Sequence, residues 1–299
     1  MRITTNQMAR NILFNLSDNA RRTERLEREM SSGKRVTVPS DDPSSAIKIL
    51  HLKTALMESD QYRRNLEDGQ GWLQTSEAAL NSVEQIVGDV QTLAIQGANG
   101  SLPTGARDAL AKSVQELYNQ LLAQANSMYG NRYLFGGWKT LTQPYTEVAG
   151  VVTYNGDANE IKREIGFGQT VPVNLPGDRV FGPPPGATDD VFTTLTKVRD
   201  AVNSGDIAAL TGQLSSDLAT IHDNLLAQGA EVGARVSRLD QTSERLLDAK
   251  TNFSDLLDKE QNADIVEVVM NLKILENARN TTLAATAQLI KTTLLDFLR

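Results

Sequence analysis

The chain has 299 residues, a net charge of −7 and no cysteine, so disulfide, iron–sulfur and thiolate–zinc chemistry are excluded. Aromatic residues make up only 5% of the chain. A large globular core normally contains more aromatic volume, whereas seams between helices are built from aliphatic residues and alanine. An acidic chain without a dense Lys/Arg cluster also does not fit a nucleic-acid-binding protein.

The N-terminal sequence lacks the features of a secretory signal peptide. It contains neither an apolar core nor a cleavage site of small residues. No apolar run approaches the roughly 18 residues that a membrane span requires. Composition alone therefore predicts a cytoplasmic protein that does not insert into membranes.

The first predicted helix covers residues 7–30 and carries an apolar seam. A spacing that averages 3.5 residues keeps one stripe of a helix facing a partner, as a coiled coil requires. Gly33 is expected to end this helix. The apolar seam positions are Ile12, Leu16, Leu26 and Met30, with polar Asn19 and Thr23 at the remaining steps.

Two long helices are predicted next. Asp42 is suited to the N-cap and Pro43 to the first position of a helix that ends near Asn99. A second helix is predicted over residues 104–129, and the short turn between the two makes them antiparallel neighbours.

Residues 131–187 predict a small β-domain, because they are rich in glycine, proline and β-forming residues. The strand candidate 151–154 is followed by Asn155-Gly156, a dipeptide typical of hairpin turns. Pro172 indicates that the strand candidate 171–175 lies at an edge.

Helices resume at Asp190, and Asp206 is expected to cap a long continuous helix over residues 207–257. A break is expected at residues 262–264, before a last helix that reaches the end of the chain. This helix carries an early seam at Val268, Leu272 and Leu275, which leads to the second terminal seam at Leu283, Ala287, Ile290, Leu294 and Phe297.

These elements predict a mainly α fold of nested long antiparallel helices, with terminal coiled-coil helices and a small inserted β-domain. The expected domains are a terminal coiled-coil domain (1–40 and 262–299), a long-helix bundle (41–130 and 188–261) and the β-domain (131–187). The two terminal seams are the expected assembly interface.

The sequence offers no convincing catalytic, cofactor-binding or metal-binding residues. His51 and His222 each stand alone in a predicted helix, without the spacing of a metal site. The pair Asp41-Asp42 is better explained as a helix start than as a catalytic carboxylate pair. For Trp72 and Trp138 we favour packing over ligand stacking. These features predict an assembly protein and not an enzyme.

Both ends of the chain resemble bacterial flagellins and their relatives. The stretches that carry this resemblance at the N-terminal end are 26–36, 41–42, 65–69, 77–81 and 90–100, and the C-terminal hundred or so residues resemble the flagellin C-terminal helices. Flagellins typically carry a different segment where this chain has Asn131-Arg132-Tyr133-Leu134-Phe135-Gly136-Gly137. That string resembles the hook-associated protein 3 family, as do residues 39–43, 153–157 and 176–181, although Arg179 stands where family members often have an acidic residue.

The resemblance implies a structural protein that joins the flagellar hook, through hook-associated protein 1, to the flagellin filament. It implies a ring of copies assembled through the terminal helices, which would be poorly ordered in the free monomer. It also implies an extracellular location on the flagellum, reached by type III export with a chaperone and without a cleaved signal peptide. This replaces the cytoplasmic location predicted from composition. The alternatives are a short flagellin and a tip or translocator protein of a virulence secretion system.

Overall fold

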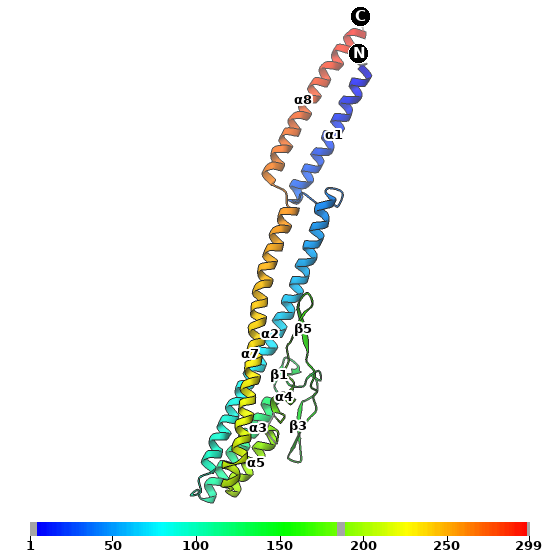
Figure 1. The fold of residues 1–299 in the computed structure, drawn as a ribbon. Helices are drawn as coiled ribbons and strands as arrows, with labels where there is room; N and C mark the ends of the chain where they lie inside the picture. Colours follow the sequence, from blue (N-terminus) through cyan, green and yellow to red (C-terminus); the bar gives the residue numbers. More distant parts are fainter. Residues whose placement is uncertain (1–4, 184–188, 298–299) are drawn as a thin grey trace. The chain divides into compact units, whose positions relative to one another are not determined.

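In the computed structural model the backbone is described for residues 5–183 and 189–297, and side chains for residues 7, 10–183 and 189–287. The chain divides into two compact units (Figure 1). The first comprises Met1–Glu58 and Asp248–Arg299, and the second comprises Ser59–Leu247. This division is coarser than the three domains expected from the sequence, whose boundaries stay a prediction.

The first unit is built from helices alone. It contains α1 (Thr5–Ser32), the beginning of α2 (Pro43–Gly97), the end of α7 (Gln213–Gln261) and α8 (Ile265–Phe297). Helices α1 and α8 pack side by side and run antiparallel (Figure 1). The predicted terminal helices are therefore present.

Local signals explain where these helices begin and end. Gly33 follows α1 with a φ of +67°, a conformation that glycine adopts at little cost. Oδ1 of Asp42 accepts hydrogen bonds from the backbone N–H groups of Ser44 and Ser45, both at 3.1 Å, which caps α2 as predicted. The predicted break at residues 262–264 is confirmed, and Oδ1 of Asp264 accepts a bond from the Val266 amide at 2.9 Å.

The second unit holds the larger hydrophobic core. Helices α3 (Thr104–Ala125) and α5 (Val191–Ser204) pack against each other, while α2 and α7 contribute apolar stripes. Its fully buried members include Leu66, Leu73, Val87, Val114, Leu121, Leu195, Val202, Ile221 and Leu239. Within the described ranges no helix is both long enough and apolar enough to cross a membrane.

Two predicted helices are wrong in extent. The helix predicted over residues 104–129 stops at Ala125, because the side chain of Asn126 bonds back to Leu122 O at 3.0 Å and to both backbone groups of Tyr145. The continuous helix predicted over residues 207–257 is interrupted at Gly212, whose φ of −101° and ψ of −116° leave the helical region. The chain instead forms a short α6 (Ile207–Thr211), which Asp206 caps as expected, and then α7.

The predicted β-domain consists of three separate antiparallel hairpins and the short helix α4 (Gly177–Phe181). The hairpins pair β1 (Met128–Tyr129) with β2 (Arg132–Tyr133), β3 (Tyr145–Val148) with β4 (Val151–Tyr154), and β5 (Lys162–Gly166) with β6 (Gln169–Pro172).

The prediction of a hairpin turn at Asn155-Gly156 is wrong. The turn that follows β3 lies at Ala149 and Gly150, which have φ values of +53° and +82°, as a tight two-residue turn requires. Asn155 instead stabilises the open end of this hairpin. Its backbone N–H donates to Pro144 O at 2.8 Å, and its side-chain Nδ2 donates to Thr146 Oγ1 at 2.9 Å.

The hairpins contact the helices through aromatic rings and through one close approach at a glycine. Tyr145 lies 5.2 Å, between ring centroids, from both Phe181 and Phe192. Trp72 is buried, as predicted, and meets Tyr129 edge-on at 5.8 Å. A Cβ added to Gly69 in α2 would lie only 2.9 Å from Cγ1 of Val173, so the absence of a side chain there lets the β segment approach the helix.

Candidate assembly surface

The structure places the predicted seam of α1 along its contact with α8 only in part. Ile12, Leu16 and Leu26 are half-buried, whereas Met30 is exposed. The polar seam position Thr23 is also half-buried, and its hydroxyl donates to the backbone carbonyl of Asn19 at 2.9 Å. The hydroxyl of Thr23 therefore finds its hydrogen-bond partner within α1.

The predicted seam of α8 is buried near the start of the helix and exposed further on. Leu283 and Ala287 are exposed, and the side chains of Ile290, Leu294 and Phe297 lie outside the described residues. The part of α8 that does face inward lies nearer its start, where Val268 and Leu272 are buried. The role of the nine seam residues as an assembly interface thus stays a prediction.

A second apolar face of α8 was missed from the sequence. Val266, Met270 and Ile274 recur every four residues, so they share one face of the helix, and they are 79%, 57% and 58% exposed. They lie on the side opposite Val268 and Leu272. The sequence did contain a signal for this face, because apolar residues on two opposite sides of one helix predict a packing partner on each side.

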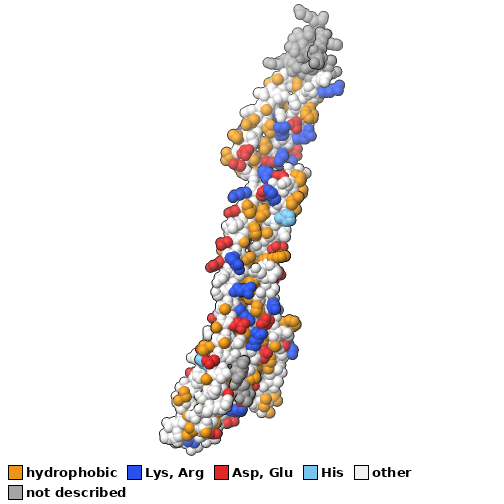
Figure 2. All heavy atoms as spheres, in the orientation of Figure 1, with side chains coloured by type: hydrophobic (Ala, Val, Ile, Leu, Met, Phe, Trp, Pro, Cys, Tyr) orange, Lys and Arg blue, Asp and Glu red, His pale blue; other side chains and the backbone are white. Residues whose placement is uncertain are grey.

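The beginning of α2 carries a similar uncovered stripe in the same unit. Ile47, Leu50 and Met57 are exposed and are spaced by three and seven residues, which again places them on one face. Hydrophobic side chains remain visible at the surface along the helices in the space-filling view (Figure 2). Apolar area left uncovered in this pattern is typical of a surface that binds a protein partner.

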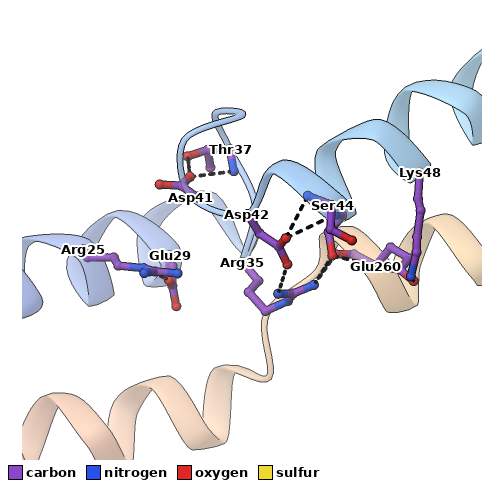
Figure 3. A network of polar contacts seen from close by, with 10 residues as sticks. Arg25, Glu29, Arg35, Thr37, Asp41, Asp42, Ser44, Lys48 and Glu260 are labelled. Atoms are coloured by element: carbon purple, nitrogen blue, oxygen red, sulfur yellow. Dashed lines mark hydrogen bonds and ion pairs between the residues drawn. The ribbon is translucent and has the colours of Figure 1, made fainter.

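A polar cluster fixes the first unit at the junction of its four helical segments (Figure 3). Arg35 donates from Nη1 to Oδ2 of Asp42 at 3.2 Å, and from Nη2 to Ser45 Oγ at 3.1 Å and to the backbone carbonyl of Glu260 at 3.0 Å. Its own amide donates to Gln261 O at 2.8 Å. One side chain therefore ties the segment after α1 to the start of α2 and the end of α7.

The carboxylate of Glu260 completes this cluster from the other side. It accepts hydrogen bonds from Lys48 Nζ at 2.9 Å and from Ser45 Oγ at 3.0 Å. These bonds, with that from Lys48 the larger, lower the pKa of Glu260. Hydrogen bonds from Ser45, above all from its backbone amide, and from Arg35 lower the pKa of Asp42 to about 2.

Asp41 orders the loop that precedes α2. Its Oδ2 accepts from the backbone amides of Val38 and Thr37, both at 3.1 Å, and from the Thr37 hydroxyl at 2.9 Å. These bonds, with that from the Val38 amide the largest, lower the pKa of Asp41. Asp41 and Asp42 thus have separate structural tasks and do not face each other as a catalytic pair.

The described residues contain no group of three or more His, Asp or Glu side chains that is able to hold a metal ion. His51 is exposed on α2, and Nε2 of His222 lies 3.9 Å from Oε1 of Glu84. Trp138 is not packed as predicted, since it is 65% exposed. The exposed apolar faces of α2 and α8 are suited to association with other helices.

Comparison with known proteins gives the same picture. Residues 3–140 match the family described as the bacterial flagellin N-terminal helical region. The chain is 28% identical to flagellar hook-associated protein 3 of Escherichia coli over 300 residues, which cover 92% of this chain and 94% of that protein. A flagellin of Clostridium tyrobutyricum is also 28% identical, but over 160 residues that cover 53% of this chain and 42% of the flagellin.

A solved structure shares the fold. The flagellar junction protein FlgL of Legionella pneumophila matches with a TM-score of 0.60 at 19% identity, over 73% of this chain and all of that one. Paired terminal helices with uncovered apolar faces are typical of helical assembly proteins. The chain is a structural protein of the bacterial flagellum that is similar over residues 3–140 to the flagellin N-terminal helical region and along nearly its whole length to hook-associated protein 3.

Proposed function

We propose that this protein forms a ring at the boundary between the flagellar hook and filament, and that it contacts hook-associated protein 1 on one side and flagellin on the other. The observation that carries the proposal is the exposed apolar face of α8 at Val266, Met270 and Ile274. A helix pair with such a face is incomplete as a monomer. The similarity to hook-associated protein 3 over 92% of the chain supports the same role.

The proposal includes assembly outside the cell. The chain has no cysteine, which suits export as an unfolded chain through the flagellum's own type III route. A flagellar export chaperone is expected to hold the terminal segments before export, because uncovered apolar helices associate non-specifically. The terminal helices then reach full order when neighbouring copies cover them.

The proposed role is structural and not enzymatic. The proteins to which the chain is similar are flagellar components, and the polar clusters of the first unit are occupied by helix caps and ion pairs. A catalytic role would need reactive groups that converge on a cleft. The carboxylates of Asp41, Asp42 and Glu260 instead accept hydrogen bonds from backbone amides and from the side chains of Arg35 and Lys48.

The proposal is tested by removing residues 283–299. We expect the shortened chain to remain folded and soluble, with its second unit intact by circular dichroism and hydrogen exchange, but to be absent from isolated flagella. The full-length chain, labelled with antibody on the same flagella, should mark the hook–filament boundary. Normal incorporation of the shortened chain would contradict the proposal.

Two further outcomes would point to the alternative functions. A purified full-length chain that polymerises by itself into long filaments would identify a flagellin. Binding to lipid vesicles or to the needle of a virulence secretion system would identify a tip or translocator protein. We expect neither, and either result would replace the junction role.

A further inference from the structure

The hairpin of β5 and β6 ends in an aromatic side chain that its own chain leaves uncovered. Phe167 occupies the turn beside Gly168, which has a φ of +66°, and it is 94% exposed. A phenyl ring in that position gains nothing for the fold of the monomer, since burial against water is its main favourable contribution. The ring is available as an anchor for another molecule.

The same unit contains a hollow that this ring does not fill. Trp138 forms one wall, and the hollow has a volume of about 650 Å³. Its other lining residues are Ala158, Asn159, Glu160, Ile161, Lys162 and Arg179. An aromatic wall with aliphatic and charged neighbours is the usual composition of an energetically dominant spot in a protein interface.

Trp138 is held rigidly although it is 65% exposed. Its indole Nε1 donates to Glu160 O at 3.0 Å, and its amide donates to Oδ1 of Asp157 at 3.0 Å. The preceding Gly137 has a φ of +65°, and a Cβ there would lie 2.2 Å from Asp157 O. A side chain fixed before binding loses little conformational freedom on binding.

The charges beside the ring and beside the hollow are complementary. Lys162 and Glu164 are exposed on the same face of β5, and neither forms an ion pair within residues 5–183 and 189–297. In the hollow, Arg179 Nη1 lies 3.3 Å from Oε1 of Glu160, which Arg235 also approaches. Among the residues that line the hollow, Lys162 and Arg179 outnumber the single carboxylate of Glu160, whereas the carboxylate of Glu164 lies three residues from Phe167.

We propose that Phe167 of one copy of this chain inserts into the Trp138 hollow of the next copy, with Glu164 of the first copy beside Lys162 of the second. The ring and the hollow are different surfaces of one chain, so the contact is head-to-tail, and such contacts close into a ring when the rotation permits. The ring geometry rests on the proposed function. The β hairpins would thereby add a contact between copies beyond that of the terminal helices.

Cysteine cross-linking tests the contact directly, because the chain has no cysteine of its own. Gln169→Cys places a thiol beside the tip while Phe167 is kept, and Ala158→Cys places one in the hollow. Flagella isolated from bacteria that express both single variants should contain a disulfide-linked dimer after mild oxidation. Flagella that carry either variant alone should contain none.

A matched pair controls for random collision. Val151→Cys places a thiol at another exposed position of the same unit, at the tip of the β3–β4 hairpin. Mixed with Gln169→Cys, it should give less than a tenth of the dimer that Ala158→Cys gives. Equal yields, or dimers formed by Gln169→Cys alone, would overturn the head-to-tail contact.

Charge exchange gives an independent readout. We expect Lys162→Glu and Glu164→Lys each to reduce the amount of protein on flagella at least threefold, and the double variant to restore it. Phe167→Ser should reduce it similarly, whereas Leu141→Ser, which changes another exposed apolar side chain of the same unit, should not.

The failures of the two proposals are distinguishable. A chain found at the hook–filament boundary without any cross-link would overturn the hairpin contact and leave the junction role intact. A full-length chain absent from flagella would overturn the junction role and the contact together. Failure of the double charge variant to recover would also contradict the contact.

Discussion

The guanidinium of Arg35 donates a hydrogen bond to the backbone carbonyl of Glu260, which lies 225 residues further along the sequence, across 3.0 Å. This bond joins the segment between α1 and α2 to the end of α7 within the first unit. Together with the bonds to Asp42 and Ser45, it makes Arg35 the residue on which the geometry of this junction most depends.

We therefore expect Arg35→Ala to lower the local stability of the first unit by about 1–2 kcal/mol, because three charge-assisted hydrogen bonds are lost at a partly exposed site. Hydrogen exchange of the α1 and α8 amides should speed up by about 5–30-fold. Arg28→Ala, on the exposed surface of α1, is the matched control. Equal exchange in the two variants would show that the cluster does not hold the helices.

The acid stability of the first unit should depend on Asp42. Its pKa in the folded chain is about 2, against an ordinary value of 3.8, so its contribution is complete above pH 3.8 and is lost as the pH falls toward 2. Lowering of the Glu260 pKa acts in the same direction. Thermal melts between pH 5 and about pH 2 should therefore show falling stability.

Asp42→Asn should flatten this dependence by lowering stability near neutral pH, because asparagine still caps the helix but cannot pair as an anion with Arg35. Ser44→Ala is the control, since Asp42 binds the backbone amide of Ser44 and not its hydroxyl. An unchanged acid profile in Asp42→Asn would show that another group controls the transition.

The two faces of α8 should respond differently to substitution. Met270→Ser combined with Ile274→Ser changes exposed side chains and should alter monomer stability by only about 0.5 kcal/mol, yet reduce incorporation into flagella. Leu272→Ala changes a buried side chain and should cost about 2 kcal/mol or more. Normal incorporation of the double variant would show that this face is not used in assembly.

Two glycines of α2 provide a matched test of the contact between the hairpins and the helix. Gly69→Ala should destabilise the second unit by about 1–2 kcal/mol, since its Cβ would lie 2.9 Å from the buried and stiff Val173. Gly88→Ala meets nothing within 4 Å and should stabilise the helix by about 0.5–1 kcal/mol. Urea denaturation of both variants would measure the difference. Stabilisation in both would mean that Val173 yields at no cost.

Most of the helical fold could be predicted from sequence, because its boundaries depend on local chemistry. Asp42 and Pro43 start α2, and Asp190 starts α5 through a bond to the Thr193 amide at 2.7 Å. The errors lie where distant residues decide the outcome. Asn126 ends α3 only because Tyr145 supplies partners for its amide, and no local pattern reveals that.

The candidate surface was harder to predict than the fold. Heptad spacing correctly indicated the terminal helices and the buried Val268 and Leu272, but it did not reveal the second, exposed apolar face of α8. Val268 and Val266 are equally apolar and two residues apart, yet only Val268 is buried. Trp138 was expected to be buried, but a hydrogen bond from its indole to Glu160 O holds it at the surface. That bond joins residues 22 positions apart, so no local sequence pattern predicts it.

The β-bridge between Lys34 and Asn262 aligns the end of α1 with the start of α8. A turn inserted into α1 alone would shift every side chain beyond the insertion by one turn along α8, so the paired side chains of the two helices would no longer match. Insertions and deletions in these two helices should therefore be inherited as matched pairs, a constraint that links evolutionary events at opposite ends of the gene.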